Sequence, residues 1–106
     1  MNTEKILISK DKLSNWLKEK RLLTILDIRP LKEREVTMMP GSIHVHVYDK
    51  LKANDPTAFD DFDLPKDQLI VTVCGSGKLS ITAAEKLKDK GYKAFSLQGG
   101  MKAWLI

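Results

Sequence analysis

The sequence has little cysteine and few aromatic residues, and each scarcity excludes a class of protein. Cys74 is the only cysteine in 106 residues, so no disulfide can form within the chain. A disulfide-stapled secreted scaffold is therefore excluded, and we expect a cytoplasmic protein in a reducing compartment. Aromatic residues make up only 7% of the chain and do not alternate with its lysines. This argues against the stacking platforms that bind nucleic acid.

Long apolar runs and a leader-like amino terminus are also missing. The apolar runs are only a few residues long, too short to span a bilayer. Residues 1–5 are not a basic region followed by an apolar stretch, so no secretory signal is expected. Hydrophobic residues make up 42% and charged residues 30%, which predicts one globular domain over residues 1–106. The net charge of +4 favours anionic small molecules or acidic protein surfaces as partners.

Short apolar segments alternate with amphipathic segments along the chain. The pattern predicts strands near residues 6–8, 22–26, 42–47, 69–73 and 93–97, and helices near 10–21, 31–36, 48–54, 79–90 and 99–104. Strands that alternate with helices, without a tight Asn-Gly hairpin, imply a mostly parallel sheet with helices on both faces. The expected fold is therefore α/β, with a central sheet of about five strands.

The segment at residues 42–47 alternates strictly between apolar and polar side chains. On a strand, three apolar residues would face one way and both histidines the other; these are Ile43, Val45, Val47, His44 and His46. Two histidines on one face could bind a metal, but a site needs at least one more ligand. The sequence has no CxxC motif and no second histidine pair. Polar histidines near a cleft are therefore favoured, and no metal or cofactor is expected.

A glycine-containing turn that includes Cys74 follows the apolar segment at 69–73. The spacing of Ile81, Ala84 and Leu87 predicts a helix immediately after this turn. Backbone N–H groups converge in such a turn, and the helix amino terminus adds partial positive charge. Because both effects favour a thiolate over a thiol, Cys74 is predicted to be a reactive nucleophile rather than a small buried hydrophobe.

Two phosphate-binding motifs overlap the same turn, and both fail. A P-loop needs a hydroxyl residue after Gly-Lys and a glycine five residues before that pair, but Leu79 and Thr72 stand at these positions. A dinucleotide fingerprint over residues 75–80 would have Ser80 as its third glycine. It also requires an acid at the end of the next strand, where Gln98 stands. The cysteine is therefore the better candidate for chemistry.

Four motifs in the right order resemble the rhodanese family. Leu26-Asp27-Ile28-Arg29 resembles its LDVR segment, and Met39-Pro40-Gly41-Ser42-Ile43 resembles its IPGAI turn. Residues 74–80 resemble the active loop, C-x-x-G-x-[RT]-S, and residues 97–104 resemble the closing LxGGxxxW segment. The likeness covers almost the whole chain, and it implies the rhodanese-like form of the α/β fold.

The resemblance implies a sulfurtransferase. Cys74 would take the outer sulfur of thiosulfate or of a persulfide donor, and a thiol or cyanide would then accept it. A sulfur-relay protein is a further candidate partner. Asp27 and Arg29 are expected either to form a structural pair that braces the loop or to contact substrate. The expected loop and substrate-binding residues are Gly75, Ser76, Gly77, Lys78, Leu79 and Ser80, with Ser80 also expected to cap the helix.

One position departs from the family pattern. Leu79 stands where many members have arginine, and Lys78 supplies a mobile charge one residue earlier. A phosphate transition state without an arginine clamp would be poorly stabilised, so a cysteine phosphatase or arsenate reductase is disfavoured. A non-catalytic binding or regulatory module is the main alternative. The presence of Cys74 argues against it, because inactive relatives commonly lose this residue.

Overall fold

Five parallel strands form one sheet in the computed structural model, which describes residues 5–106. In spatial order the strands are β1-β5-β4-β2-β3, so β4 lies at the centre. Every pairing is parallel, as expected when helices provide the crossovers. The predicted α/β fold is confirmed. The strands are β1 (Leu7–Ile8), β2 (Leu23–Asp27), β3 (Ile43–His44), β4 (Leu69–Val73) and β5 (Lys93–Leu97).

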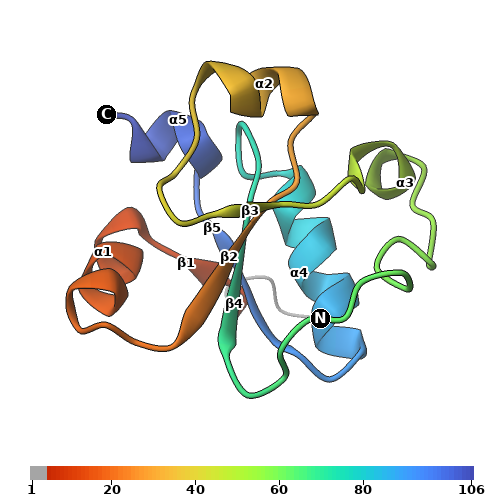
Figure 1. The fold of residues 1–106 in the computed structure, drawn as a ribbon, viewed down its shortest axis with the longest axis horizontal. Helices are drawn as coiled ribbons and strands as arrows, with labels where there is room; N and C mark the ends of the chain where they lie inside the picture. Colours follow the sequence, from red (N-terminus) through yellow and green to blue (C-terminus); the bar gives the residue numbers. More distant parts are fainter. Residues whose placement is uncertain (1–4) are drawn as a thin grey trace.

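Helices cover both faces of the sheet (Figure 1). One face is covered by α1 (Lys10–Lys18) and α5 (Gly100–Trp104), and the other by α3 (Tyr48–Lys52) and α4 (Leu79–Asp89). The short helix α2 (Leu31–Val36) lies over the edge at which the strands end. No helix within residues 5–106 has the length and apolar character needed to cross a bilayer.

The core consists of two apolar clusters, one on each face of the sheet. On the α4 face, Ala84 and Leu87 pack with Leu51 of α3 and with Ile70 of β4. On the α1 face, two helical residues pack with alternate residues of β4; these are Leu13, Trp16, Val71 and Val73. A strand buried on both faces explains why the apolar segment at 69–73 is continuous rather than alternating.

The first helix begins at the predicted residue but ends at Lys18, before the predicted end at residue 21. The Ser9 side chain accepts a hydrogen bond from the Lys12 N–H and so caps α1. The spacing of Leu13, Trp16 and Leu17 predicts that all three lie on one apolar face. Leu13 and Trp16 are buried, but Leu17 is 40% exposed, so its predicted place on that face is wrong. One residue turns a helix by about 100°, which rotates Leu17 away from the sheet.

The segment at residues 42–47 is the second exception, because only Ile43–His44 forms a strand. The Val45 N–H makes the last bond to β2, at the Asp27 carbonyl. The Val47 N–H then bonds to the Val45 carbonyl, and this tight turn leads into α3. The strand alternation is therefore broken: Val45 and Val47 are buried, whereas Ile43 is 53% exposed.

The acidic and proline-rich loop before β4 is attached to the core by aromatic side chains. Phe59 is buried in the α4-face cluster, and Phe62 and Leu64 pack against that cluster. The rings of Phe59 and Phe62 meet edge to face with centroids 6.3 Å apart. The apolar residues of this otherwise polar loop predict such an attachment, and these contacts confirm it.

Candidate active site

Cys74 follows the central strand β4 at the edge where all five strands end. A turn leads from it into α4, and the cysteine packs in the apolar cluster beneath that helix. Its exposed fraction is only 3%. The predicted order of strand, cysteine, glycine turn and helix is therefore present, at the sheet edge where open α/β folds place their sites.

Three hydrogen-bonding groups converge on the Cys74 sulfur. The Gly77 N–H donates to Sγ at 3.1 Å, and the Ser80 N–H donates to it at 3.3 Å. The Ser80 hydroxyl lies 3.3 Å from Sγ, where it accepts from a thiol. Both N–H groups lie at the amino end of α4, whose dipole adds partial positive charge. A sulfur anion would be well stabilised at this point.

Ser80 does not cap α4, which corrects the sequence-based expectation. It is the second residue of the helix, and the residue at the cap position, Lys78, makes no side-chain capping bond. The Ser80 hydroxyl instead lies between the Cys74 sulfur and the Ser96 hydroxyl. Because the backbone N–H of Ser80 also donates to this sulfur, the first turn of α4 lies against Cys74, and the Ser80 side chain points to the cysteine.

The other loop residues differ in how far they are exposed. Ser76 and Lys78 are exposed, whereas Gly75 is partly exposed and Gly77 is buried. Leu79 is partly buried and packs against the apolar cluster on the α4 face. The position that departs from the family pattern therefore contributes to the core.

The closing glycine segment forms one wall of the cysteine turn. The Met101 N–H donates to the Cys74 carbonyl at 2.8 Å, and the Lys102 N–H donates to the Gly75 carbonyl at 3.1 Å. Gly77 has a φ of +93°, and a Cβ built on it would lie 2.7 Å from the Gly99 nitrogen. Glycine is needed here both for backbone conformation and for close approach.

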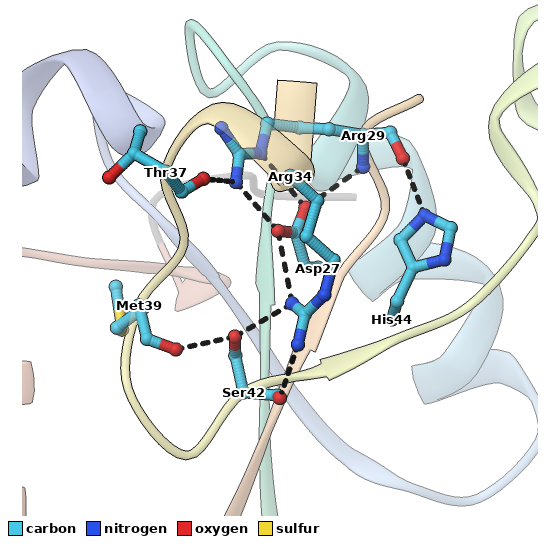
Figure 2. Close-up of polar contacts among 7 residues, drawn as sticks. All are labelled: Asp27, Arg29, Arg34, Thr37, Met39, Ser42 and His44. Atoms are coloured by element: carbon cyan, nitrogen blue, oxygen red, sulfur yellow. Dashed lines mark hydrogen bonds and ion pairs between the residues drawn. The ribbon is translucent and has the colours of Figure 1, made fainter. Parts of the chain in front are cut away.

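Asp27 and Arg29 form a buried ion pair at the end of β2 (Figure 2). Arg29 Nε donates to Asp27 Oδ1 at 3.0 Å, and Nη2 donates to Oδ2 at 2.8 Å. Burial alone would raise the pKa of Asp27, but hydrogen bonds and charge from Arg29 outweigh it, so this pKa is lowered. The pKa of Arg29 is raised, first by its bond to Asp27, although burial opposes the shift.

The polar partners of this pair lie in the neighbouring segment rather than in the cysteine turn. Arg29 donates to the Thr37 carbonyl at 2.7 Å. Arg34 donates to Asp27 at 3.3 Å and to the Ser42 hydroxyl at 2.9 Å, as Figure 2 shows. The network therefore ties the end of β2 to α2 and to the turn after it. The sequence gives no sign of this role for Arg34, which lies in a charged segment predicted only as a short helix.

The helix α2 lies next to the cysteine turn, because a Cβ built on Gly75 would be 3.8 Å from Glu33 Oε1. After Asp27, the charge of Glu33 on this helix also raises the pKa of Arg29. Among the side-chain hydrogen bonds of residues 5–106, none joins the Asp27–Arg29 pair to the loop at residues 74–80.

A cleft of about 500 Å³ is lined in part by Arg29. Its lining includes His44, His46, Tyr48 and Lys50, but not Cys74. His44 Nε2 lies 2.8 Å from the Arg29 carbonyl oxygen. The rings of His44 and His46 meet edge to face, with their centroids 4.4 Å apart. Within residues 5–106, no group of three or more His, Cys, Asp or Glu side chains is placed to hold a metal ion. His44 is partly buried and His46 is exposed, and both line this cleft.

Comparison with known proteins identifies the family. Residues 9–106 match the rhodanese-like domain. The chain belongs to this family. A rhodanese-like domain protein from Staphylococcus aureus has a solved structure with a TM-score of 0.73 and 28% identity, covering 92% of this chain and 89% of that one. Its likeness agrees with the parallel five-strand sheet described above.

Relatives with curated names include sulfurtransferases. The chain is 35% identical over 77 residues to a tRNA sulfurtransferase of Desulfurococcus amylolyticus, which covers 73% of this chain but only 14% of that protein. It is 30% identical over 82 residues to YtwF of Bacillus subtilis, covering 77% of this chain and 73% of YtwF. The rhodanese-like chain thus corresponds to a small part of the first relative and to most of the second.

Proposed function

We propose that this rhodanese-like chain is a sulfurtransferase, and that it holds the transferred sulfur as a persulfide on Cys74. The observation that supports this most strongly is the convergence of the Gly77 N–H, the Ser80 N–H and the Ser80 hydroxyl on one sulfur atom. Such a cradle stabilises a sulfur anion without a metal. Relatives named sulfurtransferases agree with this chemistry.

The reaction proceeds in two displacement steps. In the first, the Cys74 thiolate attacks the outer sulfur of thiosulfate. A new S–S bond forms, the S–S bond of thiosulfate breaks, and sulfite leaves with the electron pair. In the second step, cyanide or an acceptor thiolate attacks the outer sulfur of the persulfide. The Cys74–sulfur bond breaks, the thiolate is regenerated, and thiocyanate or an acceptor persulfide is released.

The surrounding residues have separate tasks in this proposal. The N–H groups of Gly77 and Ser80 hold the sulfur anion. Lys78 is exposed on the turn, where it attracts an anionic donor. Asp27 keeps Arg29 in place. A thiol-bearing sulfur-relay protein is a further acceptor, and we place the reaction in the cytoplasm.

Formation of thiocyanate from thiosulfate and cyanide tests this proposal. We expect turnover by the wild-type chain and none by Cys74→Ser, because a hydroxyl cannot form the persulfide. Circular dichroism and thermal unfolding serve as the fold control for the variant. A phosphatase assay with p-nitrophenyl phosphate completes the experiment, with no Cys74-dependent hydrolysis expected. Hydrolysis that Cys74→Ser abolishes, without thiocyanate formation, would favour the phosphatase instead.

One observation favours the alternative of a non-catalytic binding module, namely the 3% exposure of Cys74. A thiol this well covered would remain unreactive unless a donor could reach its sulfur. The two functions differ in a simple measurement. A folded wild-type chain that accepts sulfur neither from thiosulfate nor from an organic persulfide would be a binding module.

A further inference from the structure

A second buried serine lies behind the site and has no task in the reaction described above. Ser96 is on β5, and its hydroxyl oxygen lies 2.7 Å from the Ser80 hydroxyl oxygen. The Ser80 oxygen in turn lies 3.3 Å from the Cys74 sulfur. Both serines have an exposed fraction of 0%. The three groups therefore form a buried hydrogen-bonded chain that ends at the sulfur.

The neighbouring buried hydroxyl, on Thr72, belongs to a different arrangement. Thr72 of β4 is aligned with Ser96 of β5 in the sheet. Its hydroxyl lies 2.7 Å from the Ser80 carbonyl and 3.2 Å from the Phe95 carbonyl, so its proton is directed to the backbone. Ser96 is thus the residue whose hydroxyl faces the Ser80 hydroxyl.

The number of available protons decides the direction of the hydrogen bonds among Cys74, Ser80 and Ser96. Each serine hydroxyl can donate only one. If Ser96 donates to Ser80, the Ser80 proton points to the Cys74 sulfur and an anion there accepts it. If a thiol donates to Ser80 instead, Ser80 donates to Ser96, whose own proton then needs another acceptor. Among the side-chain hydrogen bonds of residues 5–106, the Ser80 hydroxyl is the one partner of the Ser96 hydroxyl.

We propose that Ser96 is a positioning residue, which turns the Ser80 hydroxyl proton toward Cys74 and so favours the sulfur anion. It acts through Ser80 and does not touch the sulfur. The inference deepens the proposed function, on which its relevance to the persulfide rests. Its effect on the thiolate is measurable without any sulfur donor.

The pH profile of Cys74 alkylation by iodoacetamide tests this role, because only the thiolate reacts. The midpoint of the profile is expected to rise by about half a pH unit in Ser96→Ala, since a hydrogen bond to an anion is weakened. Below the midpoint, this shift slows alkylation about threefold. An unchanged midpoint would overturn the proposal.

A double-mutant cycle shows whether Ser96 acts through Ser80. In a Ser80→Ala background, the further change Ser96→Ala should leave the midpoint where Ser80→Ala alone puts it. A shift of equal size in both backgrounds would contradict the proposed chain. Thr24→Val is the matched control, because it removes a strand hydroxyl that bonds to Gln68 and not to the site. Its midpoint should equal that of the wild type.

If Ser96→Ala does not fold, two variants of nearly equal size can replace it in the test. Ser96→Thr and Ser96→Val have nearly the same shape, and both suit a strand. The threonine variant should keep the wild-type midpoint, whereas the valine variant should show the raised one. Identical midpoints in these two folded variants would overturn the proposal. The alkylation midpoints of the wild type and the Ser96 variants could follow these expectations while the wild type forms no persulfide. That result would contradict the proposed function and leave the role of Ser96 intact.

Discussion

The N–H of Met101 donates to the carbonyl oxygen of Cys74 at 2.8 Å. This bond joins the first turn of α5 to the residue that begins the cysteine turn. It is possible because Gly100, with a φ of +59°, lets the two backbones approach each other closely. The closing segment is therefore part of the site.

Substituting Gly100 by alanine should reduce both stability and sulfur transfer. A Cβ there would overlap the Cys74 carbonyl and lie 2.7 Å from the Gly77 nitrogen, and neither backbone group can move aside without opening the turn. We expect a loss of about 3 kcal/mol in the free energy of unfolding, measured by urea titration. Thiocyanate formation by the remaining folded protein should fall at least tenfold, because the cradle shifts.

Gly41→Ala is the matched control for this change. Gly41 also has a positive φ, +81°, but a Cβ there meets nothing within 4 Å. Gly41→Ala should lose only the cost of a positive φ in alanine, about 1 kcal/mol of the free energy of unfolding. Each folded molecule should keep its sulfur-transfer activity. Equal losses in both variants would show that the close approach to Cys74 has no energetic role.

Replacing Asp27 by asparagine should destabilise the chain at neutral pH. Arg29 and Arg34 would then face a neutral amide in a buried position, which we expect to cost about 3 kcal/mol in the free energy of unfolding. Urea titration at pH 7 measures this loss. A variant as stable as the wild type would contradict the structural importance of the ion-pair network.

The same carboxylate should make wild-type stability depend on pH. The pKa of Asp27 is lowered below the ordinary value of 3.8, so the unfolded chain binds this proton more readily than the folded one. Its contribution is complete well above pH 3.8 and is lost as the pH falls through the lowered pKa. The stability difference between wild type and Asp27→Asn should therefore shrink below about pH 4. A difference that stays constant from pH 7 to pH 3 would contradict this account.

Removing the Lys78 charge should affect anionic donors selectively. In Lys78→Ala, the KM for thiosulfate should rise about threefold, a size typical of an exposed charge. Use of an uncharged trisulfide donor should change much less. Lys88→Ala is the control, since Lys88 is exposed farther along α4. If both lysine variants alter thiosulfate use equally, the charge acts on the whole surface and not at the site.

The sequence predicted the architecture because its evidence is local. Alternating apolar and amphipathic segments are enough to indicate five strands and their covering helices, and a glycine turn after a strand indicates where Cys74 lies. The predictions for Leu17, Ile43 and the Ser80 cap were wrong. Each depends either on how an element packs or on where it begins and ends, and periodicity along the chain specifies neither.

The parts of the site that the sequence did not predict are long-range contacts. Ser96 lies 16 residues from its partner Ser80, and as an isolated serine in an apolar strand it gives no signal of its own. Gly100 is part of a recognisable Gly-Gly pair, but its proximity to Cys74 follows only from the pairing of β4 with β5. Arg34 lies in a charged segment, and nothing in that segment indicates its contact with the carboxylate of Asp27.

Intact mass after incubation with thiosulfate tests the central claim most directly. The wild-type chain should gain one sulfur, about 32 Da, which cyanide or dithiothreitol should remove. Cys74→Ser, folded and treated in the same way, should keep its original mass. An unchanged wild-type mass with both thiosulfate and an organic persulfide, or sulfur retained by Cys74→Ser, would contradict a persulfide on Cys74.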